Sequence, residues 1–60
     1  MTLWQAILRL NDDLRATVTL FYYDGLSIRE ISKILGISES AVKTRLSRGR
    51  AQLRQLLDEK

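Results

Sequence analysis

Residues 27–57 read SIREISKILGISESAVKTRLSRGRAQLRQLL, and this stretch decides the fold. Ser27 followed by Glu30 is a capping box, in which each side chain binds the backbone N–H of the other residue at the start of a helix. Gly36 supplies the left-handed residue that ends a helix, and Ser38 is the N-cap of the next one. A short helix, a tight turn and a longer helix therefore follow one another, and the spacing predicts a helix-turn-helix over about residues 27–57.

Two shorter helices are expected before this segment. The first covers about residues 3–9 and follows the N-cap Thr2. The second follows Asn11, whose side chain accepts an orphan N–H, and it ends at Asp24–Gly25, where Gly25 takes the left-handed conformation. The apolar arc of the first helix comprises Leu3, Trp4, Ile7, Leu8 and Leu10. Because no stretch alternates as a strand does, the sequence predicts an all-α fold, a four-helix domain over residues 1–60 with a C-terminal helix-turn-helix.

Length and composition exclude several classes of protein. The chain has 60 residues, of which 45% are hydrophobic and 28% charged, and it contains no Cys and no His. The balance is that of a folded domain, while the missing residue types exclude disulfides, zinc sites and Ser-His or Cys-His catalysis. Asp12 and Asp13 fit the first turn of a helix, where the dipole favours acids, better than a catalytic carboxylate pair. We expect no enzyme, no cofactor and no metal.

The apolar runs of the chain are short. Gln5 and Arg9 interrupt the N-terminal one, and every run falls far below the roughly 18 residues that a membrane helix needs. The N-terminus also lacks the basic start and apolar core of a secretory signal. We therefore expect no membrane contact and a cytoplasmic location.

The net charge of +3 is concentrated at one end of the chain. Residues 1–40 contain four cations and five acids, whereas residues 41–60 contain six cations and two acids. Five of those cations, and no acid, lie from Lys43 to Arg54. A cluster of this kind on one helix is a possible footprint of a polyanion, and its alternative is a solvated helix face.

The arrangement of residues around the last helix favours DNA over that alternative. Its apolar stripe, about 100° wide, consists of Val42, Leu46, Gly49, Leu53, Leu56 and Leu57. Its opposite face carries the small residues Ser40, Thr44, Ser47 and Ala51, flanked by Lys43, Arg48 and Arg54. A helix that enters the major groove, about 12 Å wide, needs short side chains in front and cations beside them. A solvated face has no reason to be small at four successive positions and tends to mix both charges.

The chain resembles region 4 of bacterial sigma factors, and in particular of the extracytoplasmic-function group. The resemblance covers about 50 residues and includes DGLSIREISKILGISESAVKTRLSRGRAQLRQL, which begins at Asp24. Its most specific part is AVKTRLSRGR at 41–50, because helix-turn-helix motifs in general share only the GLS and LGIS elements. LNDDLR at 10–15 resembles the usual entry to the domain. Two departures are Asn11, where Pro is common, and Gly49, where Ala is common.

This resemblance implies recognition of the −35 promoter element, as double-stranded DNA, by the last helix in the major groove. Lys43, Thr44, Ser47 and Arg48 would then contact bases and nearby phosphates. Ser38, Ser40 and Arg50 would contact the DNA backbone. Arg29 and Lys33 on the third helix would reach phosphates, since the first helix of the motif often crosses the backbone. We assign Arg45, at the edge of the apolar stripe, to a structural ion pair at least as readily as to DNA.

A second surface is expected on the first two helices. The resemblance implies binding to the flap of the RNA polymerase β subunit and, in many relatives, to an anti-sigma factor. The candidate residues are Trp4, Leu8, Phe21 and Tyr22. Core packing is the favoured alternative for each of them, because a chain this short needs large apolar side chains in its core. Core packing is likewise favoured over a base-stacking platform for Trp4, Tyr22 and Tyr23.

Other functions stay open at this point. The DNA-binding domain of a two-component or quorum-sensing regulator has similar GLS and EI elements, although the basic SRGR at 47–50 favours a sigma factor. A region-4-like module that binds RNA polymerase without DNA is a further possibility. Because sigma factors also need a separate domain for the other promoter element and for strand opening, we expect an excised domain, or a small stand-alone relative, that acts at the bacterial nucleoid.

Overall fold

The computed structural model describes residues 1–58, and these form four helices with no strand among them. The helices are α1 (Leu3–Leu8), α2 (Asp12–Tyr22), α3 (Ile28–Leu35) and α4 (Glu39–Asp58). The all-α prediction is therefore confirmed. Residues 59 and 60, which belong to the predicted domain range and charge count, lie outside the described residues. Within the described part, no helix is both long and apolar enough to cross a membrane.

Local side-chain chemistry sets most of the helix ends as the sequence predicts. The Ser27 N–H donates to Glu30 Oε1 at 3.0 Å and the Glu30 N–H donates to Ser27 Oγ at 3.1 Å, so the capping box is closed in both directions. Asn11 Oδ1 accepts the Leu14 N–H at 3.0 Å and begins α2. Gly36 has a φ of 67° and ends α3 in the left-handed conformation. These bonds satisfy backbone groups that a helix end leaves unpaired.

The predicted end of α2 at Asp24–Gly25 is two residues too late. The helix ends at Tyr22, with Tyr23 as its capping residue. Gly25 nonetheless has a φ of 68°, as predicted, and so lies in the loop beyond the helix. A backbone hydrogen bond holds this loop against the end of α2, because the Leu26 N–H donates to the Leu20 carbonyl at 3.1 Å.

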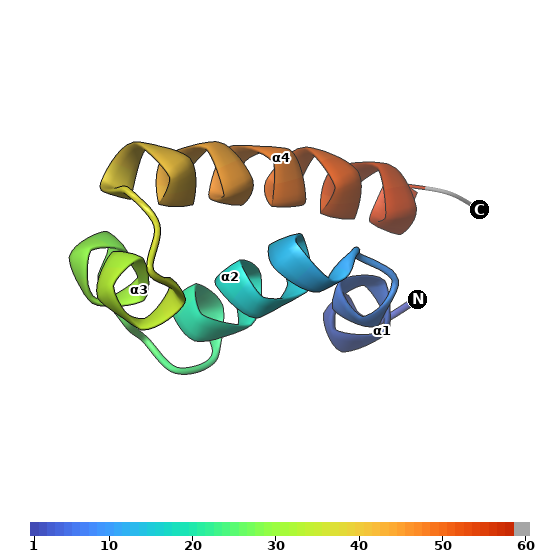
Figure 1. Ribbon diagram of the computed structural model, residues 1–60. Coiled ribbons are helices and arrows are strands. Elements are labelled where there is room, and N and C mark those ends of the chain that lie inside the picture. The colour runs from blue at the N-terminus through green and yellow to red at the C-terminus, as the bar shows by residue number, and fades with distance from the viewer. Residues whose placement is uncertain (59–60) are drawn as a thin grey trace.

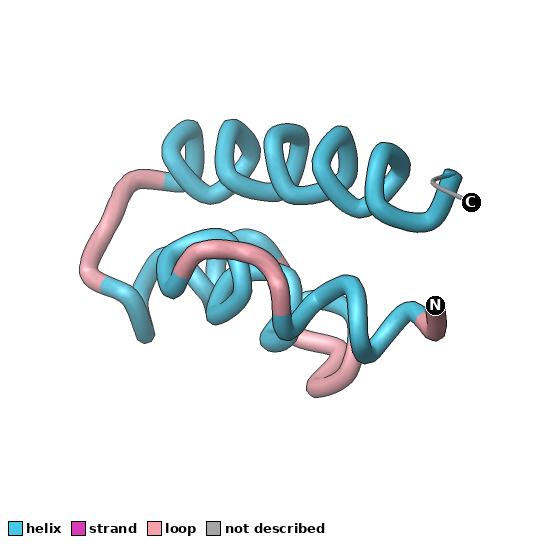
Figure 2. Tube along the Cα trace, turned by 90° about the vertical axis from the view of Figure 1, so that its right-hand side faces the viewer, coloured by secondary structure: helices cyan, strands magenta, loops and turns pink. Residues whose placement is uncertain are grey.

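The long helix α4 is one layer of the molecule, and the other three helices lie on one side of it (Figure 1). The view turned by 90° shows the same arrangement, with the α3–α4 connection at one end of the layers (Figure 2). The core between the layers consists of Ala6, Ile7, Leu10, Leu14, Val18, Ile31, Val42, Leu46 and Leu53. Because α4 contacts each of the other helices, its buried stripe holds the domain together and its far side stays free.

The apolar arc of α1 is only partly buried, which corrects the sequence prediction. Ile7 and Leu10 belong to the core, and so does Ala6, which the arc left out. Leu3, Trp4 and Leu8 are about half exposed instead. The helix has only six residues, and the neighbouring helices cover one side of it, so a broad apolar arc is wider than the surface available to bury it.

Candidate nucleic-acid interface

The buried and exposed faces of α4 follow the predicted division closely. Val42, Leu46, Gly49 and Leu53 are buried, and Leu56 is half-buried. Leu57, predicted in the same stripe, is 41% exposed at the C-terminal end of the helix, beyond most of the packing. The opposite side carries four exposed small residues, which are Ser40, Thr44, Ser47 and Ala51. From Ser40 to Ala51, α4 therefore presents a narrow exposed ridge of small side chains.

Exposed cations lie on both sides of this ridge. Lys43 is on one side and Arg48 on the other, and both side chains are exposed. Together with Ser40, Thr44 and Ser47 they form one continuous surface over the first two and a half turns of α4, which we call the reading surface. No acid occurs in the sequence from Ser40 to Leu57. Short side chains flanked by cations are the arrangement that a helix in the major groove requires.

Ser38 and Arg50 lie at the two ends of this region. Ser38 Oγ accepts the Ala41 N–H at 3.0 Å as the N-cap of α4, and its hydroxyl proton remains free to donate. Arg50 Nε donates to the Leu46 carbonyl of its own helix at 3.4 Å. Since helical residues rise by 1.5 Å each, Arg50 lies roughly 18 Å beyond Ser38 along α4. Arg50 is therefore distant from Ser38, whereas Ser47, three residues before it on the same helix, is its neighbour on the helix surface.

Arg45 forms the structural ion pair that the sequence predicts for it. Its Nη1 lies 3.9 Å from Asp13 Oδ1 in the first turn of α2, and the Arg45 side chain is 28% exposed. The sequence does not identify Asp13 as the partner, because no local spacing connects α2 to α4. A cavity of about 330 Å³ lies at this junction, and its lining includes Arg45, Arg48 and Gln52.

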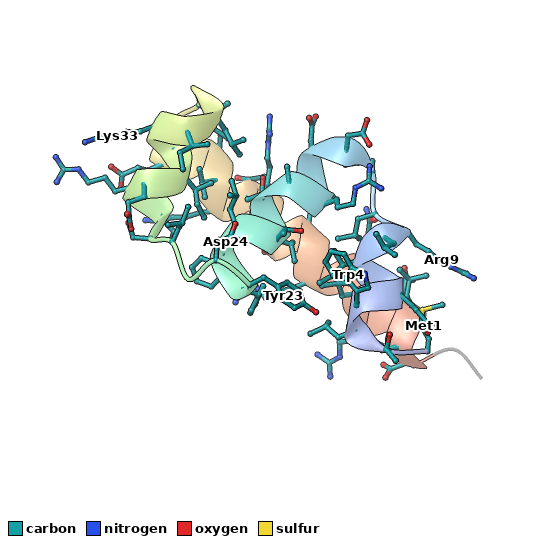
Figure 3. The ribbon with its side chains drawn as sticks, turned by 90° about the horizontal axis from the view of Figure 1, so that it is seen from below. Met1, Trp4, Arg9, Tyr23, Asp24 and Lys33 are labelled. Carbon is teal, nitrogen blue, oxygen red and sulfur yellow. The ribbon has the colours of Figure 1, made fainter. Side chains whose placement is uncertain are left out.

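The cations of α3 are also accessible. Arg29 and Lys33 are exposed, and Lys33 points outward from the helix (Figure 3). The turn between α3 and α4 keeps the two helices in contact. The Ser32 hydroxyl donates to the Ile37 carbonyl at 2.5 Å across this turn, which fixes the first helix of the motif against the second.

The second predicted surface is largely exposed, which corrects the expectation of core packing. Trp4 and Tyr22 are each 46% exposed and Leu8 is 49% exposed. Only Phe21 packs against the core, as a partly buried residue. Tyr23 is exposed as well.

Aromatic contacts on this surface link α1 to the end of α2. The rings of Trp4 and Tyr23 meet edge to face with centroids 5.2 Å apart (Figure 3), and Phe21 and Tyr22 do so at 5.1 Å. A groove of about 370 Å³ lies nearby, between the start of α1 and the end of α4. Its lining consists of Leu3, Tyr22, Arg50, Leu53, Arg54, Leu57 and Asp58.

These features define a helix-turn-helix domain. The short helix α3 is followed by a turn with a left-handed glycine and then by α4, whose exposed ridge of small residues is flanked by cations. Residues 1–53 match the family model described as Sigma-70, region 4. The chain therefore belongs to the sigma-70 family as a region 4 of the extracytoplasmic-function (ECF) type, as the resemblance of its sequence predicts.

Curated relatives carry the same assignment. The chain is 48% identical over 56 residues to the ECF RNA polymerase sigma factor SigW of Bacillus subtilis, covering 93% of this chain and 30% of the relative. It is 46% identical over 52 residues to the RNA polymerase sigma factor SigZ of the same organism, covering 87% of this chain and 30% of the relative. The ECF RNA polymerase sigma factor SigM of Mycobacterium tuberculosis is 40% identical over 53 residues, or 88% of this chain and 27% of that protein. The chain thus spans less than a third of these relatives, and the regulator and polymerase-module alternatives are not favoured.

Proposed function

We propose that residues 1–60 act as one domain that recognises the −35 element of promoter DNA during transcription initiation. In this proposal the first half of α4 enters the major groove of double-stranded DNA. The observation that carries it is the reading surface, in which small exposed residues lie between Lys43 and Arg48 on a stretch of α4 that contains no acid from residue 40 to residue 57. Membership of the sigma-70 region 4 family supports it independently.

The residues of the reading surface have different roles in this proposal. Lys43, Thr44, Ser47 and Arg48 contact base edges and nearby phosphates. Arg48 has the planar fork that binds guanine O6 and N7 together, whereas Ser and Thr hydroxyls accept or donate and so suit several bases. These contacts specify the sequence, and phosphate contacts position the helix.

The DNA backbone is contacted from both ends of the motif. Ser38 and Ser40 meet phosphates at the start of α4, where the helix dipole is positive. Arg50 reaches a phosphate at the far edge of the groove, which fits its distance from Ser38. Arg29 and Lys33 meet the backbone from α3. The domain acts by binding alone, with no catalytic step and no cofactor.

A second part of the proposal concerns protein partners. RNA polymerase, through its β flap, binds the exposed apolar surface formed by Trp4, Leu8, Phe21 and Tyr22, and an anti-sigma factor is a competing partner for it. The half-exposed Trp4, Leu8 and Tyr22 support this, because partner-binding surfaces carry exposed apolar and aromatic side chains. The proposed place of action is the cytoplasm, at the nucleoid.

Binding to a fluorescent duplex with a −35-type sequence at several salt concentrations tests the DNA-binding part. A domain that neutralises about five phosphates has a slope of log affinity against log salt of about −4 to −5. A scrambled duplex of equal length measures the non-specific part. A slope near zero would refute DNA binding and would leave the polymerase-binding role alone.

One matched pair of variants tests whether DNA binds to the reading surface on α4. Lys43→Ala removes a cation from the reading surface. Arg9→Ala removes another exposed cation, at the C-cap of α1, whose side chain points outward from the edge of the domain (Figure 3). Lys43→Ala is expected to make the slope shallower by about one unit, and Arg9→Ala to leave it unchanged. Equal effects would show that the charge of the whole domain, rather than α4, binds the DNA.

A further inference from the structure

Arg45 lies at the boundary between the core of the domain and the proposed DNA contact. It is three residues before Arg48 on the same helix, and residues at this spacing are neighbours on a helix surface. Its guanidinium is only partly exposed and lies 3.9 Å from the carboxylate of Asp13, which is 76% exposed. A residue in this position has two competing anionic partners, the carboxylate of α2 and a phosphate of the bound DNA.

The cavity at this junction places Asp13 close to the reading surface. Its lining comes from both sides of the α2–α4 contact and consists of Asn11, Asp13, Leu14, Arg45, Arg48 and Gln52. Arg48 thus shares a cavity with an acid of another helix although no acid is near it in the sequence. The carboxylate of Asp13 lowers the positive potential at the edge of the surface where a phosphate would bind.

The contact between Asp13 and Arg45 is weak enough to be exchanged. A charge-assisted hydrogen bond between such groups has a length of about 2.7–2.9 Å, so the separation of 3.9 Å describes a loose ion pair. The other acid of this turn, Asp12, is held by Arg15 of the same helix. Exposed pairs of this kind contribute little stability and are screened by salt.

We propose that Asp13 limits the affinity of the domain for DNA by occupying Arg45 and repelling phosphates at that edge of the reading surface. The inference rests on the proposed function. Because phosphate contacts carry no sequence information, an acid that withholds one cation lowers binding to all duplexes alike. The base contacts of the reading surface then decide a larger share of the total binding energy.

The substitution Asp13→Asn tests this. It removes the charge while keeping the size and the preference for a helix N-terminus. Arg45 then neutralises one more phosphate, so the slope of log affinity against log salt becomes steeper by about 0.9. Between 50 and 200 mM salt the loss of affinity is expected to be roughly 3-fold greater than for the wild type. Affinities for the −35-type and scrambled duplexes rise by the same factor at low salt.

Two further variants separate this mechanism from a general change of charge. Asp24→Asn removes the same charge from the loop at the other end of α2 and is expected to leave the slope unchanged (Figure 3). Arg45→Ala combined with Asp13→Asn is expected to lose the gain in slope, because the guanidinium that Asp13→Asn releases is then absent. Circular dichroism melting curves confirm that each variant is folded.

The outcomes distinguish this inference from the function on which it rests. A wild-type slope near −4.5 together with an unchanged slope in Asp13→Asn overturns the role of Asp13 and leaves DNA recognition intact. An equal gain in Asp24→Asn, or a gain that persists in the double variant, also overturns it. A wild-type slope near zero overturns both proposals.

Discussion

Replacing Gly49 by Ala is expected to destabilise the domain, although Ala is the better helix former. A Cβ at Gly49 would lie 2.7 Å from Val18 Cγ2, well inside the 3.5–4.0 Å of an ordinary contact between carbon atoms. Val18 is fully buried and is β-branched, so one χ1 rotamer is strongly preferred in its helix and it has little freedom to move away. The close approach of α2 to α4 at this point therefore requires glycine.

Two opposing effects set the change in the free energy of unfolding that Gly49→Ala causes. Ala in place of Gly inside a helix stabilises by about 1 kcal/mol, whereas overpacking a buried contact costs about 1–3 kcal/mol. We expect Gly49→Ala to lower the free energy of unfolding by about 1 kcal/mol, with a loss of at most about 2 kcal/mol. For a domain of this size, 1 kcal/mol corresponds to a drop in melting temperature of about 4–8 °C.

Urea unfolding followed by circular dichroism measures the effect of Gly49→Ala on the free energy of unfolding, once in the wild-type protein and once in the variant Val18→Ala. In Val18→Ala, where the obstructing methyl is absent, the same Gly49→Ala substitution is expected to stabilise by about 1 kcal/mol. Ala51→Gly, at an exposed position of the same helix, is the matched control and is expected to cost about 1 kcal/mol through helix propensity alone. If Gly49→Ala has the same effect in both backgrounds, within about 0.5 kcal/mol, then contact with Val18 is not the reason for glycine.

Three other substitutions test the reading surface, the core and a helix cap. Arg48→Ala is expected to reduce discrimination between the −35-type and scrambled duplexes by about 1–3 kcal/mol, and unchanged discrimination in a binding assay would remove its role in base recognition. Leu46→Ala is expected to cost about 2–5 kcal/mol of a small total; its melting curve is compared with that of Leu57→Ala, whose more exposed side chain should cost much less. Hydrogen bonds from the backbone and side chain of Ser27, together with nearby Lys33, hold the pKa of Glu30 below its ordinary value of 4.5. The stability that Glu30 contributes is thus complete above pH 4.5 and is lost as the pH falls through the lower folded-state pKa, so the difference in melting temperature from Glu30→Gln should disappear in acid.

Most helix boundaries, although not the end of α2, were predictable because they depend on residues close together in the sequence. The capping box of Ser27 and Glu30, the N-cap Asn11 and the left-handed Gly36 each act within five residues. The two faces of α4 were predictable for a related reason, since a 20-residue helix with a regular apolar stripe has only one way to face a core.

Contacts between helices were not predictable in the same way. The sequence predicts burial of Trp4, but the periodicity of a six-residue helix does not say how much of its arc the other helices can cover. The contact of Val18 with Gly49 and that of Asp13 with Arg45 depend on how α2 crosses α4. No local pattern encodes that crossing. Spacing places most of the predicted DNA-binding residues on one helix, but the acid that we propose to compete with DNA comes from another.

The crossing of α2 and α4 connects the core of the domain with the edge of its reading surface. Seen from below, α2 passes obliquely across α4 (Figure 3), and the absence of a side chain at Gly49 lets Val18 approach closely there. The contact between Asp13 and Arg45 joins the same two helices, so we expect the depth of packing at Gly49 to influence how far the first turn of α2 lies from Arg45. A bulkier residue at 49 would move Asp13 away from a guanidinium that is already 3.9 Å distant, and at that separation a small shift is enough to release the cation. We therefore expect the packing at Gly49 in the core to affect the ion pair of Asp13 and Arg45 at the edge of the reading surface.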